Sequence, residues 1–328
     1  MDAAERGKYI DLYRSMVTIR KFELMVERLH LEGILPGLKH LYVGEEAVAV
    51  GVCAALEADD YLVSTHRGHG HLIAKGAEVH KIMAELYGKK TGYSKGKGGS
   101  MHIADIERGI LGTNGIVSGG IPIAGGAALS AKMRGTTQIT VCFFGDGGAN
   151  EGIFHESLNI AGAWKLPILF ICENNQYAIS TAQERVSAVT CMAERAASYG
   201  MPGVVVDGMN VLAVREASWE AAARAREGAG PTLIECNTYR LIGHYAGEGS
   251  RGDSYRSGSE FEKWKTRCPI RQFRELLLSQ AGVPASELEG LEQSVEGLID
   301  EAVEFAAKSP YPEPRDALED LFLAKGAR

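Results

Sequence analysis

The chain has 328 residues, of which 45% are hydrophobic and 23% are charged, a composition ordinary for a globular protein with a substantial core. Its net charge of -7, with no run rich in Lys or Arg, argues against nucleic acid as the main partner. No apolar run approaches the ~20 residues that a membrane helix needs, and residues 1–6 lack the features of a secretory signal. Six cysteines without a CxxC pair fit a reducing compartment. We therefore expect a cytoplasmic protein that binds neither nucleic acid nor membrane.

The first predicted element is an amphipathic helix at about 8–32, where apolar side chains recur on one stripe. Glycine is dense from Gly37 to Gly126, and short helices at 46–56 and 79–87 alternate there with loops. A Gly/Ala-rich helix follows at 119–133. Its small side chains would let a neighbouring helix approach closely.

The centre of the chain predicts a βαβ unit. Apolar runs at 139–144 and 166–172 are typical of strands buried on both faces, and the helical spacing of apolar residues between them predicts a helix at 151–165. A right-handed crossover makes the two strands parallel, so the residues after both strands meet at one edge of the sheet, where open α/β proteins bind ligands.

The alternation continues with strands at 203–206 and 232–236 and a helix at 211–227. The predicted fold class is therefore α/β, a parallel sheet with helices on both faces. A glycine-rich stretch at 243–258 predicts a long functional loop that is mobile without a ligand. Ser259 and Glu262 predict a capping box, and helices at 270–281 and 286–308 follow. We treat 1–328 as a single domain with a helical tail at about 260–328.

Two polar residues follow the strands of the βαβ unit. Asp146 stands after the first strand and Asn175 after the second, so a carboxylate and an amide oxygen would face one small volume. Asp and Asn are also frequent turn and cap residues. Oxygen ligands of this kind suit Mg2+. The glycines beside Asp146 would let the backbone approach a diphosphate.

Histidine is concentrated in one segment. His66, His69 and His71 lie within six residues, beside Arg67. A zinc cluster or a solvated loop are the alternatives to a ligand site, but zinc sites of this spacing usually recruit a cysteine or a distant carboxylate, and none is indicated.

Seven motifs in order resemble the alpha subunit of the heteromeric thiamine diphosphate-dependent 2-oxo acid and acetoin dehydrogenases. They are His66–His71, Lys95–His102, Asn114–Val117, Gly145–Gly147 with Asn174–Asn175, Trp164–Pro167, Val206–Met209 and Thr238–Arg240. The similarity runs from about Tyr9 to about Arg271, which is most of the chain.

This resemblance implies the thiamine diphosphate-binding fold and a set of site residues. It implies that Mg2+ is held by Asp146, Asn175 and the backbone carbonyl of Tyr177. It implies that Arg67, Gly147, Gly148 and His244 contact the diphosphate, and that the backbones of Gly115 and Val117 contact the aminopyrimidine ring. His66 also belongs to the implied cofactor-binding set and holds the position where pyruvate-type relatives carry Tyr. It implies catalytic roles for His40 and His244. Tyr245 stands where animal pyruvate relatives carry a regulatory phosphoserine.

The resemblance also implies an activity and partners. The expected enzyme is an α2β2 heterotetramer whose beta subunit supplies the glutamate that activates the cofactor. It would cleave acetoin or decarboxylate a 2-oxo acid and pass the two-carbon unit to a lipoyl-bearing acyltransferase or another acyl carrier. The motifs look more similar to those of acetoin dehydrogenase alpha subunits than to those of pyruvate dehydrogenase alpha subunits. A pyruvate-type subunit, or a biosynthetic relative that loads an acyl carrier protein, is the alternative. A non-catalytic scaffold and a nicotinamide dehydrogenase are disfavoured, the latter because a dinucleotide fingerprint is missing.

Overall fold

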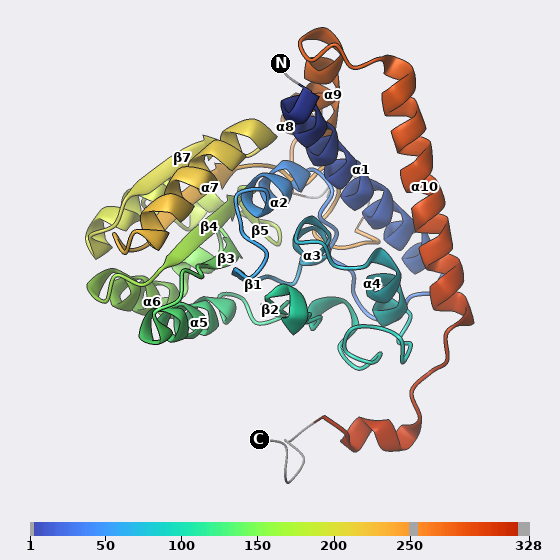
Figure 1. Cartoon of the computed structure of the whole chain (residues 1–328), viewed down its shortest axis with the longest axis horizontal. Coiled ribbons are helices and arrows are strands. Elements are labelled where there is room, and N and C mark those ends of the chain that lie inside the picture. Colours follow the sequence, from blue (N-terminus) through green and yellow to red (C-terminus); the bar gives the residue numbers. More distant parts are fainter. Residues whose placement is uncertain (1–2, 249–254, 321–328) are drawn as a thin grey trace.

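The computed structural model describes residues 3–248 and 255–320, and a parallel sheet lies at its centre (Figure 1). Within the described residues this sheet has six strands in the order β2-β1-β3-β4-β8-β7, and every neighbouring pair is parallel. The strands are β1 (Tyr61–Val63), β2 (Ile110–Gly112), β3 (Thr140–Gly145), β4 (Ile168–Asn174), β7 (Gly203–Asp207) and β8 (Thr232–Asn237). The predicted parallel sheet is confirmed.

Alternate side chains of the central strands enter two different hydrophobic clusters. On β3, Val141 and Phe143 pack in the cluster that contains α2 (Glu46–Cys53) and α7 (Val211–Arg226). Cys142 and Phe144 pack in the cluster on the other face, with α5 (Gly120–Arg134) and α6 (Gly152–Ala163). Helices therefore cover both faces, which confirms the α/β class and explains why the strands are continuous apolar runs.

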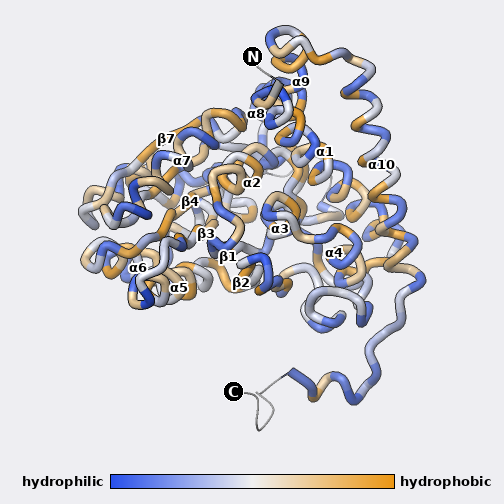
Figure 2. The backbone as a smooth tube through the Cα atoms, in the orientation of Figure 1, coloured by the Kyte–Doolittle hydropathy of each residue, from blue (hydrophilic) through white to orange (hydrophobic). Residues whose placement is uncertain are grey.

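The remaining helices, apart from α8, add apolar side chains to the cluster on the first face. They are α1 (Ala3–Leu31), α3 (His69–Ala74), α4 (Val79–Leu86), α8 (Gly258–Lys265), α9 (Pro269–Ser279) and α10 (Ala285–Lys308). The long helix α10 lies against α1 and α4 (Figure 1). Its hydropathy alternates along the helix, whereas the strands are more uniformly hydrophobic (Figure 2). Among the described residues, no helix combines the length and apolar character needed to cross a bilayer.

The structure differs from the predicted local structure at two points, and a third prediction falls partly outside the described residues. Strands β1 and β2 were not expected, because three residues are too few to carry an alternating pattern. The predicted capping box at Ser259 is wrong: the hydroxyl of Ser257 caps α8 by accepting from the amide of Glu260, at 3.1 Å. Residues 249–254 of the predicted loop at 243–258, with its predicted mobility, lie outside the described residues.

A buried carboxylate shapes the glycine-rich segment before the sheet edge. Glu85 on α4 is fully buried and accepts four backbone N–H groups from one loop. They come from Ser94, Gly96, Gly98 and Gly99, at 2.8 to 3.0 Å. The loop has no regular secondary structure to satisfy these donors, so Glu85 takes that place.

We predict that Glu85→Ala lowers the free energy of unfolding by on the order of 3–5 kcal/mol, because it leaves several buried donors unsatisfied. Urea unfolding followed by circular dichroism measures the loss. Glu85→Gln retains one acceptor oxygen and should lose less. Substitution of the exposed Glu107 by Ala is the surface control, and an equal loss in both alanine variants would contradict the role given to Glu85.

Candidate functional site

All eleven residues that the sequence indicated line one cavity of about 430 Å3 at the carboxyl edge of the sheet. They are His40, His66, Arg67, Gly115, Val117, Asp146, Gly147, Gly148, Asn175, Tyr177 and His244. Strand pairing brings them together: Gly145, the last residue of β3, is aligned with Glu173 near the end of β4, so Asp146 and Asn175 emerge side by side.

Asp146 is a buried carboxylate with one oxygen that has no hydrogen-bond partner among the described residues. Its side chain is 2% exposed, and Oδ2 makes no hydrogen bond in the described structure. Burial raises the pKa of this carboxyl to about 6, although Arg240 lowers it. An anion in such a place is costly unless a cation neutralises it. The position therefore fits a bound metal ion.

The side-chain amide of Asn175 is oriented by a neighbouring acid. Its Nδ2 donates to Oε1 of Glu45 at 3.0 Å, and its Oδ1 accepts from the amide of Tyr177 at 3.3 Å. Glu45 is fully buried, and its second oxygen lies 3.5 Å from Nε of Arg67. Burial raises the pKa of Glu45, and the nearby Arg67 opposes that shift.

Close backbone packing beside Asp146 requires glycine. A Cβ at Gly147 would lie 2.5 Å from Cβ of Ala178, and one at Gly148 would lie 2.6 Å from Oγ of Ser118. Ser118 in turn donates to the carbonyl of Gly148 at 2.7 Å. Backbone therefore lines this part of the cavity, as the approach of a diphosphate requires.

Two buried guanidinium groups add positive charge to the cavity. Arg67, between β1 and α3, donates to the carbonyl oxygens of Leu41 at 2.6 Å and His244 at 3.1 Å. Arg240, three residues after β8, donates to the carbonyl of Ile179 at 2.9 Å. Arginine stays protonated even when buried, so both groups can bind an anionic ligand.

Three imidazole rings lie together in the same cavity. The ring of His40 lies 4.7 Å from that of His66 and 4.8 Å from that of His244, centre to centre. Burial, with Arg67 as the next cause, lowers the pKa of His40 to about 3, of His66 to about 2 and of His244 to about 3. The rings are therefore neutral.

This cluster could in principle hold a metal ion, since one nitrogen from each ring lies within 4.8 Å of the other two. Arg67 and Arg240 stand next to it, however, and lower the pKa of all three rings by their charge. The same repulsion disfavours a second cation. We interpret the three rings as hydrogen-bonding groups.

The other two histidines of the run at 66–71 are not among the residues that line the cavity. His69 lies between Glu23 of α1 and Ser100, at 3.1 and 2.9 Å. His71 lies between Ser64 and Glu173, at 2.7 and 3.0 Å. Both rings are fully buried, so neither a zinc cluster nor a solvated loop describes this run.

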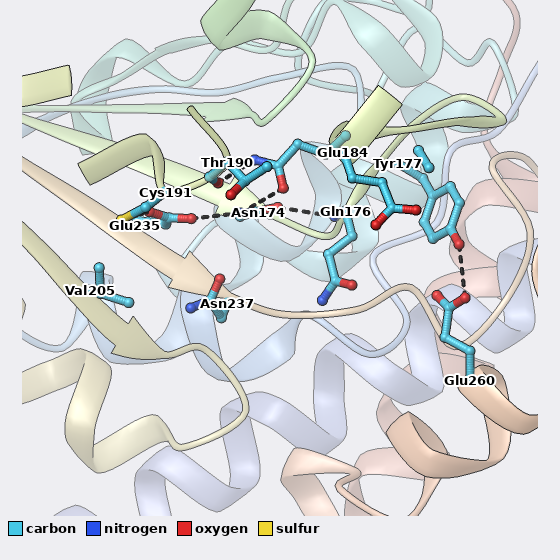
Figure 3. A pocket seen from close by; sticks show the side chains of 12 residues that line it. Asn174, Gln176, Tyr177, Glu184, Thr190, Cys191, Val205, Glu235, Asn237 and Glu260 are labelled. Carbon is cyan, nitrogen blue, oxygen red and sulfur yellow. Dashed lines mark hydrogen bonds between the residues drawn. The ribbon is translucent and has the colours of Figure 1, made fainter. Parts of the chain in front are cut away.

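A second cavity, of about 570 Å3, shares Tyr177 with the first (Figure 3). Two bonds fix the chain between the cavities: Asn174 donates to Glu235 at 2.6 Å, and the hydroxyl of Tyr177 donates to Glu260 at 2.8 Å. Among the described residues that line the second cavity, none is Lys or Arg. It therefore lacks the positive groups that distinguish the first.

Sequence reasoning did not assign Glu45 or Arg240. Arg240 belongs to the motif Thr238–Arg240. Residues that follow parallel strands meet at one edge of the sheet, and this applies to Arg240 as it does to Asp146 and Asn175, because β8 pairs in parallel with β4. Glu45 precedes a helix and carries no strand-end signal. Only the fold brings it to Asn175.

The fold and the cavity define an α/β protein with a polar cavity at the sheet edge, lined by a buried carboxylate, two arginines and three histidines. The family model of the dehydrogenase E1 component matches residues 14–315. The alpha subunit of the acetoin:2,6-dichlorophenolindophenol oxidoreductase of Bacillus subtilis is 50% identical, over 97% of this chain and 94% of the relative. Its counterpart from Cupriavidus necator is 46% identical, over 98% and 96%. The alpha subunit of the pyruvate dehydrogenase E1 component of Porphyra purpurea is 42% identical, over 97% and 93%.

The chain belongs to the dehydrogenase E1 component family. As a member of that family it is a thiamine diphosphate-dependent oxidoreductase. The family resemblance inferred from the motifs is thereby confirmed.

The lowered pKa values predict that His40, His66 and His244 do not titrate between pH 5 and 8. An unfolded chain takes up protons at these rings near pH 6.5, so the three groups reduce the free energy of unfolding as the pH falls from about 6.5 towards 3. NMR of histidine ring signals against pH tests this, with assignment by single His→Gln variants and the urea-unfolded chain as the control. A midpoint near pH 6.5 for any of the three in the folded chain would contradict it.

Proposed function

We propose that this chain is the alpha subunit of an enzyme that cleaves acetoin and passes the two-carbon unit to a lipoyl-bearing acyltransferase or another acyl carrier. The observation that carries the proposal is the single cavity in which all eleven indicated residues meet. Acetoin is preferred as the substrate because the relatives at 50% and 46% identity carry acetoin in their names. Pyruvate is the second candidate, supported by the relative at 42% identity.

The proposed metal ion is Mg2+, held by Asp146, Asn175 and the backbone carbonyl of Tyr177. Support comes from the unpartnered Oδ2 of Asp146 and from the oxygen chemistry of the set, which suits a hard cation that also binds phosphate. Glu45 accepts the amide nitrogen of Asn175, an arrangement that leaves the amide oxygen for the cation.

The proposed diphosphate site lies beside the metal. The backbones of Gly147 and Gly148 approach the ligand closely, Arg67 neutralises its charge, His66 donates to one of its oxygens, and His244 lies beside it. Gly115 and Val117 offer backbone contacts to the aminopyrimidine ring. Thiamine diphosphate, when bound, supplies a nucleophilic carbon and an electron sink for cleavage next to a carbonyl.

This chain's own contribution is binding, orientation and control of protons. His40 and His244 are the proposed catalytic residues. Because both rings are neutral, each can donate one N–H to a substrate oxygen without losing a proton to water. The buried walls made by Glu45, Arg67 and Arg240 exclude water from that side of the cavity.

The proposed partner is a beta subunit, in an assembly of two alpha and two beta subunits. Val117 lines the cavity and is 52% exposed, so the site is open on that side. Apolar side chains on and directly after α5 and α6 are also exposed, among them Ile123, Ile153 and Trp164. We also propose that residues 1–328 form one domain, which holds the diphosphate half of the cofactor. None of the six cysteines is paired, which supports the reducing cytoplasm as the location.

Asp146→Ala should abolish Mg2+-dependent binding of thiamine diphosphate by the assembled enzyme while the fold is retained, because it removes the charged metal ligand. Titration calorimetry measures the affinity, and circular dichroism verifies the fold. Asp207→Ala is a matched control, since Asp207 ends β7 at the same edge but does not line the cavity. Unchanged affinity in the Asp146 variant would remove the proposed metal site.

The isolated chain should show no turnover of acetoin or pyruvate, and co-expression with its beta subunit should restore it. The assay is the reduction of 2,6-dichlorophenolindophenol with each substrate. Activity with and without the partner shows whether the beta subunit is needed, and the two kcat/KM values show whether acetoin or pyruvate is the preferred substrate. Full activity of the chain alone would refute the shared site, and a higher kcat/KM for pyruvate would favour the second candidate.

A further inference from the structure

We infer that Arg240 is a positioning residue that fixes His244 as the neutral tautomer with its proton on Nε2, so that His244 acts in the cavity as an uncharged hydrogen-bond donor. The inference rests on the proposed function for the identity of the reaction. The tautomer itself is a property of this chain's own contacts and can be tested without substrate.

The contact between the two side chains is direct. Nη1 of Arg240 lies 2.8 Å from Nδ1 of His244. Nη2 of Arg67 lies 3.4 Å from the same nitrogen and donates mainly to the backbone carbonyl of His244, at 3.1 Å. Arg240 is 1% exposed and is among the largest side chains buried to this extent. Water therefore does not replace either guanidinium at Nδ1.

The chemistry of the two partners determines the position of the proton. A guanidinium group has five N–H donors, no acceptor and a pKa too high for deprotonation in a protein. Nδ1 of His244 must then accept, and a neutral imidazole that accepts at one nitrogen carries its proton on the other. Nε2–H is directed away from the two guanidinium groups by the geometry of the ring, and His244 lines the cavity.

The charges around the ring act in the same direction. Three titratable or charged groups face His244 from neighbouring segments: His40, His66 and Arg67. Arg240, Glu248 and Tyr255 belong to the segment between β8 and α8 that carries His244 itself. Glu248 accepts from the backbone amide of His244. Burial and the two arginines hold the pKa of the ring near 3, so an imidazolium does not compete with the neutral donor.

The consequence for the reaction is specific. A neutral Nε2–H can stabilise negative charge that develops on a substrate oxygen and keeps its proton throughout the physiological pH range. An imidazolium would instead be a general acid whose protonated fraction falls as the pH rises. Arg240 therefore selects the first of these two roles for His244.

Arg240 also anchors the chain, because it donates to the carbonyl of Ile179. A variant of a second buried arginine can distinguish this anchoring of the backbone from the effect of Arg240 on the tautomer of His244. Arg256 donates to the carbonyl oxygens of Arg240 at 2.7 Å and Ile242 at 2.8 Å, so it supports the same backbone. Arg256→Gln is the matched control for a structural effect.

The test is two-bond 1H–15N correlation NMR of the full chain with 15N-labelled histidine, with His244 assigned from the His244→Gln variant. In the wild-type chain Nδ1 of His244 should have the chemical shift of a non-protonated nitrogen and Nε2 that of a protonated one, with and without thiamine diphosphate and Mg2+. A proton on Nδ1, or exchange between both tautomers, would overturn the inference without any variant.

Arg240→Gln should mix the tautomers and raise the pKa of His244 towards 6.5, because it removes one of the two arginine charges that lower this pKa. In the assembled enzyme it should make the loss of kcat/KM at acid pH begin at a higher pH than in the wild type. Arg256→Gln should leave the tautomer and the shape of the pH profile unchanged. An Arg240→Gln chain with the wild-type tautomer and profile would overturn the inference. Failure of acetoin or pyruvate turnover would instead concern only the proposed function.

Discussion

The parallel pairing of β3 with β4, and of β4 with β8, is the constraint on which the rest of the molecule depends. It makes three separate segments leave the sheet at one edge, and each segment brings a different chemical group. Asp146 brings a carboxylate, Asn175 an amide and Arg240 a guanidinium. If one strand ran the other way, its polar residue would lie at the opposite edge of the sheet, several strand residues away.

Burial of charge is the second organising principle. Glu45, Glu85 and Asp146 are all nearly inaccessible to water, yet their surroundings differ. Glu85 is satisfied by four backbone donors and shapes a loop. Asp146 retains an unpartnered oxygen that faces a cavity. The contrast between a satisfied and an unsatisfied carboxylate separates a structural acid from a ligand-binding acid more clearly than sequence position does.

Much of the fold and the site could be predicted from the sequence, because the relevant signals are local. Long apolar runs fixed β3, β4 and β8, and the polar residues after them followed from the geometry of parallel strands. Strands β1 and β2 could not be predicted, because three residues are too few to show an alternating hydrophobic pattern. The place of Glu45 in the site could not be predicted for a different reason. Its contact with Asn175 joins residues 130 positions apart, and no local sequence pattern encodes such a contact. Within the histidine run, spacing alone did not separate His66, which lines the cavity, from His69 and His71.

The networks of His69 and His71 tie distant parts of the chain to the wall of the cavity. One runs from Ser100 through His69 to Glu23 on the first helix, and the other from Ser64 through His71 to Glu173 on β4. A substitution at one member of a network leaves the other members as buried polar groups without hydrogen-bond partners. Selection is then expected to act on each trio as a unit. Glu23 and Ser100, 77 residues apart, are then expected to be substituted together or to stay unchanged. Exchange of a helix between relatives would fail unless the residues bonded to that helix were exchanged as well.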